Sequence, residues 1–242
     1  MKEQKDWESF YSSFSSIKLK EKHFSMASFI KSICEDAKDI IDIGCGSGEY
    51  SIAFSHEFEK VIALDISDSL INKLIEEAKD KIDNIEFIAS DYQNYYEKHD
   101  ISFLSFSPVI QNIDDLKRVI KQTNKSVFIL TVDEGSYDYH RFELIKLLPP
   151  RKMGGFIKNA KWIEESLGSL NIDYQSKSFT ESSEEKMDRE YAIEYFVSYF
   201  MAIGYKKEEV EGTITKYIDD NLDDNNLIEK HKLNTKLIFF KI

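Results

Sequence analysis

The chain has 242 residues and a strongly acidic charge balance, with 32 Lys and Arg residues against 44 Asp and Glu residues and a formal net charge of −12. Phosphate backbones are bound by clustered Lys and Arg, so this balance disfavours a nucleic acid as a partner. The length suits one α/β domain with additions, and we expect residues 1–242 to form a single domain.

Targeting and metal-binding signals are not evident in the sequence. The first ten residues are largely polar and charged, and no later stretch is apolar over the length needed to cross a bilayer. We therefore expect a soluble, cytoplasmic protein without a membrane partner. Two cysteines, Cys34 and Cys45, and five scattered histidines lack ligand spacing, so no metal is expected. The oligomeric state stays open.

The first half of the chain alternates between apolar runs and helical patterns. Residues 7–36 have aromatic and aliphatic side chains at helical spacing, and we expect an N-terminal helical cap over 1–36. Strands are predicted at 40–43, 61–66, 85–89, 101–106 and 127–132, with helices between them such as 69–79 and 114–122. This alternation predicts a parallel sheet with helices on both faces.

The second half, residues 136–242, has a different pattern. Helices are expected at 139–148 and 160–170, a strand at 172–179, and then a polar break. Aromatic side chains at helical spacing predict a helix at 190–203, which Gly204 ends. One or two more polar helices at 206–230 and a final strand at 235–242 would complete the chain. The sequence thus predicts a helical insertion, at about 183–233, before the last strand.

Three glycines at alternate positions follow the first predicted strand. Gly44, Gly46 and Gly48 would let a ligand approach the backbone closely at the start of a helix. A dinucleotide site needs G-x-G-x-x-G, but Glu49 stands where its third glycine would be. The carboxylates of Glu49 and Asp42 would repel a pyrophosphate, whereas they suit a ligand with an ammonium and a sulfonium group.

The run from Asp42 to Gly48, D-I-G-C-G-S-G, resembles the first signature of the class I S-adenosylmethionine-dependent methyltransferases. This resemblance implies a Rossmann-like, doubly wound, seven-stranded, mostly parallel sheet in three layers, with the cofactor-binding core at residues 37–135. It implies S-adenosylmethionine as the cofactor. It also implies acids after the second and third strands, and Asp65 and Asp91 stand there. The residues that it suggests for cofactor binding are Asp42, Gly44, Cys45, Gly46, Gly48, Asp65, Ile66, Leu70, Asp91, Tyr92, Phe106, Ser107 and Tyr11.

The sequence contains fewer indications of the methyl acceptor than of the cofactor. Several relatives that methylate amide or exocyclic amino nitrogens have an Asn/Asp-Pro-Pro-aromatic motif after the fourth strand, whereas this chain has Ser105-Phe106-Ser107-Pro108. This difference and the acidic charge favour a small-molecule acceptor. His140, after the fifth strand, is the candidate general base. The alternatives are a non-catalytic S-adenosylmethionine-binding or sensor protein and, less favoured, a nicotinamide-dependent oxidoreductase.

Overall fold

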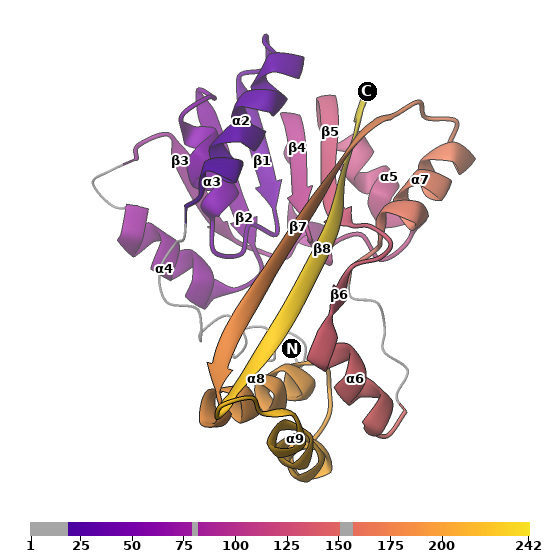
Figure 1. The fold of residues 1–242 in the computed structure, drawn as a ribbon. Coiled ribbons are helices and arrows are strands. Elements are labelled where there is room, and N and C mark those ends of the chain that lie inside the picture. Colours follow the sequence, from indigo (N-terminus) through magenta and orange to yellow (C-terminus); the bar gives the residue numbers. More distant parts are fainter. Residues whose placement is uncertain (1–18, 79–81, 151–156) are drawn as a thin grey trace.

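The computed structural model describes residues 19–78, 82–150 and 157–242. Helices and strands alternate along the chain (Figure 1). In chain order they are α2 (Glu21–Ile33), β1 (Asp39–Ile43), α3 (Glu49–Ser55), β2 (Lys60–Asp65), α4 (Asp68–Ala78), β3 (Ile85–Ala89), the 3₁₀ turn η1 (Tyr92–Asn94), β4 (His99–Ser105), α5 (Ile113–Lys121), β5 (Thr123–Val132), β6 (Tyr137–Asp138), α6 (Tyr139–Leu147), α7 (Ala160–Ser169), β7 (Gln175–Asp188), α8 (Arg189–Ala202), α9 (Lys207–Asn221) and β8 (Asn226–Lys241).

The strands form one mixed sheet in the order β3-β2-β1-β4-β5-β8-β6, and β7 pairs with β8. The first five strands are parallel, whereas β8 is antiparallel to β5, β6 and β7. The expected α/β class and mostly parallel sheet are confirmed, although the sheet has eight strands because the two-residue β6 was not anticipated. The strand order reverses between β1 and β4, the place where open α/β sheets bind ligands.

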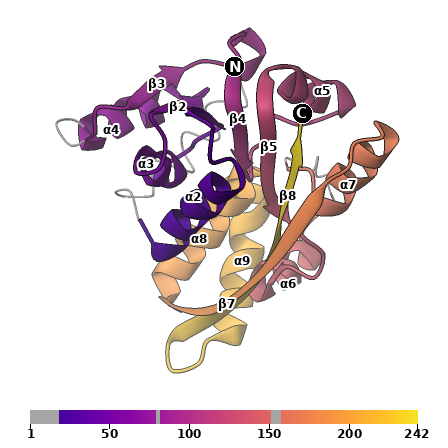
Figure 2. The same cartoon turned by 90° about the horizontal axis from the view of Figure 1, so that it is seen from above.

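Two apolar layers hold helices on the two faces of the sheet. On one face, Ile30 of α2 and Phe54 of α3 are fully buried against Phe103 and Phe128. On the other face, Leu116 of α5 and Ile163 and Leu167 of α7 pack on the opposite side chains of the same strands. The view from above shows these helix pairs on either side of the sheet (Figure 2). Strands buried on both faces are apolar throughout, which explains their clear sequence signal.

The long strands β7 and β8 extend the fold beyond the parallel sheet. β8 pairs with β5 only over residues 235–241, while it pairs with β7 from residue 226 onward. Since Thr235 lies opposite Val132, the last residue of β5, the first part of β8 runs past the carboxyl ends of the parallel strands. This two-stranded arm carries α8 and α9, which lie with α6 beyond the arrowheads of β1 and β4 (Figure 1).

The arm and these helices form what we call the cap, made of α6, β6, α8, α9 and the parts of β7 and β8 from 183 to 188 and from 226 to 233. The cap has an apolar core of its own, centred on Phe196, Phe200, Ile214 and Leu144. Phe196 and Phe200 are completely buried. The aromatic spacing seen in the sequence at 190–203 therefore reflects packing between α8, α9 and α6.

Three predictions in this region are wrong. The helix expected at 206–230 ends at Asn221, and the final strand begins at Asn226 and not at 235. Asp224 and Asn225, with φ of 46° and 60°, form a tight turn at this point, and left-handed turns favour such residues. The polar break after 179 is also strand, because β7 continues to Asp188. One face of the arm meets water. On the other face Met187, Leu227 and the charged Glu229 are buried against the cap helices, so its strands lack the apolar alternation that marks a half-buried strand.

The cap core provides a test of the packing. Phe196→Ala should lower the free energy of unfolding by about 3–5 kcal/mol, because it leaves a cavity in a fully buried site. Tyr191→Ala on the same helix, where the ring is 47% exposed, should change it by only about 0.5 kcal/mol. Urea denaturation measures both values. Equal losses for the two variants would contradict the buried position of Phe196.

Candidate functional site

The glycine loop between β1 and α3 has a backbone that needs glycine. Gly44, Gly46 and Gly48 have φ of 75°, 54° and 79°, in the left-handed region. A Cβ atom at Gly44 would lie 2.5 Å from Ser107 Oγ, and one at Gly48 would lie 2.5 Å from Leu74 Cδ2, while nothing lies within 4 Å of one at Gly46. The loop is therefore packed against the segment after β4 at Gly44 and against α4 at Gly48, whereas the space beside Gly46 is open.

Asp42 is the last residue but one of β1, just before this loop, and is almost fully buried. Ser51 Oγ, on α3, donates a hydrogen bond of 2.6 Å to its carboxylate. Burial raises the pKa of Asp42 to about 7, and the nearby charges of Asp65 and Glu49 act in the same direction, while the Ser51 hydrogen bond opposes them. The carboxylate thus joins the end of β1 to the first turn of α3, the two elements that the loop connects.

Asp65 ends β2 and faces the same loop. Its two oxygens accept hydrogen bonds of 2.9 Å from the backbone N–H groups of Gly46 and Ser67. Burial raises the pKa of Asp65, and hydrogen bonds from the backbone of Ser67, Gly46 and Ile66 oppose the rise. A carboxylate has about four acceptor positions, so this orientation leaves acceptor capacity for a ligand. The arrangement suits a pair of hydroxyl groups.

The neighbours of Asp65 divide into exposed and buried residues. Ile66 is 47% exposed, unusual for a large apolar side chain beside a polar loop, while Leu70 is buried. After β3, Asp91 is exposed and accepts a hydrogen bond from the Gln93 N–H, which begins η1. Tyr92 is buried in the sheet core. Ile66 and Asp91 are therefore placed to meet a ligand at this edge, whereas the Tyr92 ring is occupied with packing.

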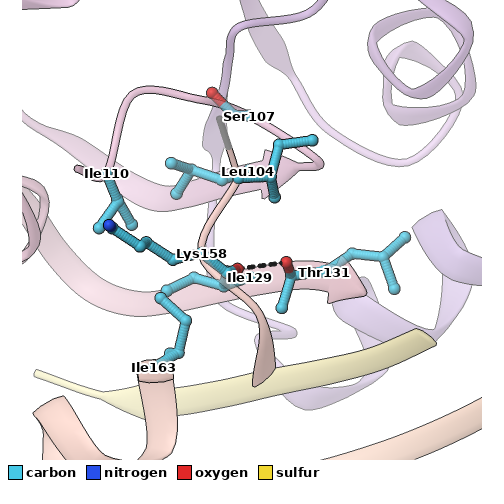
Figure 3. Close-up of a pocket in the computed structure, with 9 residues that line it drawn as sticks. Leu104, Ser107, Ile110, Ile129, Thr131, Lys158 and Ile163 are labelled. Atoms are coloured by element: carbon cyan, nitrogen blue, oxygen red, sulfur yellow. Dashed lines mark hydrogen bonds between the residues drawn. The ribbon is translucent and has the colours of Figure 1, made fainter. Parts of the chain in front are cut away.

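The loop after β4 borders the glycine loop through Ser107. On its other side Ser107 lines a pocket with Leu104, Ile110, Thr131, Lys158 and Ile163 (Figure 3). Its volume is about 10 Å³, far below the usual range for ligand sites, roughly 300–1,000 Å³. The Thr131 hydroxyl donates to the Lys158 carbonyl at 2.6 Å, which ties β5 to the segment before α7 (Figure 3). We interpret this pocket as a gap in the packing beside the site.

Comparison with known proteins bears on this geometry. Residues 40–127 match the family model of a methyltransferase domain. The YcgJ protein from Bacillus subtilis aligns with a TM-score of 0.59 over 89% of this chain and 97% of its own, at 13% identity. Residues 40–127 are therefore similar to a methyltransferase domain, and the YcgJ structure shares the α/β fold of this chain.

Two further relatives extend the comparison. Coclaurine N-methyltransferase, in a structure bound to N-methylheliamine and SAH, aligns with a TM-score of 0.51 over 94% of this chain and 74% of its own, at 14% identity. A tRNA/tmRNA (uracil-C(5))-methyltransferase from Campylobacter hominis is 34% identical over 74 residues. That match spans 31% of this chain and only 20% of the relative. The structural likenesses describe the fold, and the sequence match is local.

His140, the predicted base, lies in the cap, on α6. Its ring Nδ1 is 2.8 Å from the Tyr217 hydroxyl of α9, and its backbone N–H donates to the buried carboxylate of Glu229. Burial lowers the pKa of His140 and raises that of Glu229 to about 7. These contacts join α6 to α9 and β8, so they do not place His140 with the glycine loop. Tyr11 lies outside the described residues.

Several residues that support the site were missed in the sequence. Ser51 and Ser67 hold Asp42 and Asp65 in place. Tyr50 lies in the first turn of α3. Its ring packs edge-on against the ring of His23 of α2, with 4.9 Å between the ring centres, and at a tilt against Phe103, with 5.0 Å between the ring centres. Burial and the nearby charge of Asp42 raise the pKa of its hydroxyl. Serine and tyrosine occur throughout the sequence, so their presence alone does not indicate a role in a site. Only their position beside a buried acid would have identified them.

The close approach at Gly44 predicts a graded effect of added methyl groups. Gly46→Ala should lower the free energy of unfolding by about 1–2 kcal/mol, since it adds left-handed strain without a clash. Gly44→Ala should cost more, because its Cβ would also displace Ser107. Chemical denaturation of both variants measures the difference. An equal or smaller loss for Gly44→Ala would contradict the contact.

The raised pKa of Asp42 predicts a pH-dependent effect of Asp42→Asn. The folded-state pKa of about 7 lies above the ordinary value, about 4. The stabilising contribution of the protonated carboxyl is therefore complete below pH 4 and is lost as the pH rises through 7. Relative to the wild type, Asp42→Asn should gain thermal stability between pH 4.5 and pH 8. A constant difference in melting temperature across that range would contradict the shift.

Ser51→Ala is the matched control for this measurement. It keeps the Asp42 carboxyl and removes the hydroxyl that stabilises the ionised form. Its melting temperature should therefore fall most, relative to the wild type, at pH 8, the opposite trend to Asp42→Asn.

Proposed function

We propose that the protein transfers a methyl group from S-adenosylmethionine to a small-molecule acceptor. The observation that carries this proposal is the Asp65 carboxylate, fixed by two backbone N–H groups with acceptor capacity remaining, beside the open middle of the glycine loop. The ribose of an adenosyl ligand presents two adjacent hydroxyls that suit such a carboxylate, and exposed Ile66 offers an apolar surface to the adenine ring. Asp91 is a further candidate contact.

The charges around the loop favour a cationic ligand over a dinucleotide. Glu49 is the first residue of α3, the position where a pyrophosphate would meet the helix N-terminus. Its carboxylate accepts a hydrogen bond of 2.6 Å from Ser47 Oγ and is therefore held at that end of the loop. A phosphate there would be repelled, whereas the sulfonium and ammonium groups of S-adenosylmethionine would be attracted.

The residues of this chain need to do little covalent chemistry. When bound, S-adenosylmethionine supplies a methyl group already activated by the positive charge on sulfur. The glycine loop, Asp65 and the Ser107 loop would bind and orient it, and the acceptor would be held in line while water is excluded. A thiolate or carboxylate acceptor needs no base, so the His140 base stays a prediction for a hydroxyl or amine acceptor only.

A small-molecule acceptor is favoured by the charge of the whole chain. The local relative from Campylobacter hominis is named for action on tRNA and tmRNA. RNA binding relies on a positive surface, and a net charge of −12 opposes it. The cap lies beyond the carboxyl ends of β1 and β4, on the side where open α/β sheets bind ligands. A protein that only binds S-adenosylmethionine would have the same loop, so transfer to a metabolite library, with bulk tRNA alongside, separates the two functions.

Ligand binding tests the cofactor assignment. In calorimetric titration the protein should bind S-adenosylmethionine and its demethylated product S-adenosylhomocysteine (SAH), and it should not bind NAD. Asp65→Asn should weaken SAH binding by about 10–100-fold, because charged hydrogen bonds to the ribose are lost. Asp68→Asn removes the same charge from the exposed first turn of α4 and is the matched control. Tight NAD binding, or equal SAH affinity of Asp65→Asn and Asp68→Asn, would overturn the assignment.

A further inference from the structure

Phe106, the first residue after β4, has an unusual backbone. In the described part of the chain, four non-glycine residues have positive φ: Phe106 at 49°, Asn171 at 54°, Asp224 at 46° and Asn225 at 60°. Asn171 follows the end of α7, and the other two form the turn before β8. Asparagine and aspartate tolerate the left-handed region, so these three are ordinary, whereas a bulky aromatic residue there is a true outlier.

The side chains along β4 show what this backbone does. Phe103 packs on the α2 and α3 face of the sheet, and Leu104 packs on the α5 and α7 face, as alternation requires. Continued alternation would place Phe106 on the same face as Leu104. Phe106 instead packs against the cluster that contains Phe103. The left-handed residue therefore reverses the alternation just where the strand ends.

The same reversal sets the position of Ser107. Its hydroxyl lies so close to Gly44 that a Cβ on the glycine would be 2.5 Å away, and it lines the pocket beside Leu104 (Figure 3). Pro108 follows, and a residue before proline is restricted to extended conformations. Ser107 thus has little freedom to compensate for a different backbone at Phe106. Strain of this kind persists where the surroundings over-determine it, and it clusters at functional sites.

We propose that the left-handed backbone of Phe106 is a positioning element of the ligand site, which holds Ser107 against Gly44 and so fixes the glycine loop in its binding conformation. This inference rests on the proposed function, because the loop is taken as the cofactor-binding loop. It assigns the role to the backbone conformation and not to the aromatic ring. The ring only anchors the turn in the apolar layer below.

Two substitutions separate these roles. Phe106→Asn removes the ring and keeps a residue that tolerates the left-handed region, whereas Phe106→Val keeps an apolar side chain but is β-branched and resists that region. We expect Phe106→Asn to bind SAH within about threefold of the wild-type affinity despite a lower melting temperature, and Phe106→Val to bind about tenfold more weakly or worse. If the ring were the important part, the order of the two affinities would be reversed.

Asn171→Val is the matched control, because it forces a β-branched residue into the same backbone region away from the loop. It should lower the melting temperature and leave SAH affinity within about threefold of the wild type. Equal affinities of Phe106→Asn and Phe106→Val, or a loss for Asn171→Val as large as for Phe106→Val, would overturn the inference. If the wild type binds no SAH, the proposed function fails first, and this result is distinct from a reversed order among variants that bind.

Discussion

The close contact between Gly44 and Ser107 is the constraint on which the site depends. It joins the ends of β1 and β4, the two neighbouring strands between which the strand order reverses, and it leaves no room for a side chain at Gly44. Because the contact is made by backbone and a small hydroxyl, it fixes the loop without filling the space in front of it. The left-handed glycines cost conformational entropy, and they allow a tight loop whose N–H groups at Gly44, Gly46 and Gly48 are all hydrogen-bonded within the protein. The hydrogen bonds of Ser51 to Asp42 and of Gly46 to Asp65 hold the candidate site on its other sides.

The cap introduces a second unit of packing that the parallel sheet alone would not provide. Its apolar core is separate from the two layers on the sheet, and its polar contacts join α6 to α9 and to the first part of β8. Arg141 donates to Asp138 and to the Tyr195 hydroxyl, and its guanidinium lies 4.0 Å from the centre of the Tyr199 ring. These contacts fix the orientation of α8 relative to α6. Among the described residues, none of the helices is both long and apolar enough to span a bilayer.

The sequence was most informative where one physical cause dominates. Buried parallel strands have to be apolar, so the first five strands, with Asp65 at the end of the second, were located within a few residues. The spacing of Gly44, Gly46 and Gly48 likewise indicated the loop, because other residues cannot adopt those backbone angles without strain. The arm gave no such signal, because the charged Glu229 occupies one of its buried positions. Its turn depends on Asp224 and Asn225, a pair that also suits a helix end. The reversed side-chain alternation at Phe106 could not be predicted from the sequence, since a phenylalanine at the end of an apolar strand is typical of ordinary core packing.

The most direct measurement is a crystal structure of the protein with SAH. We predict that both ribose hydroxyls will lie within hydrogen-bonding distance of the Asp65 carboxylate, with the adenine against Ile66 and the glycine loop and Ser107 unmoved. Binding of SAH elsewhere, or a loop that rearranges so that Ser107 leaves Gly44, would contradict a preformed cofactor site at the carboxyl ends of β1, β2 and β4.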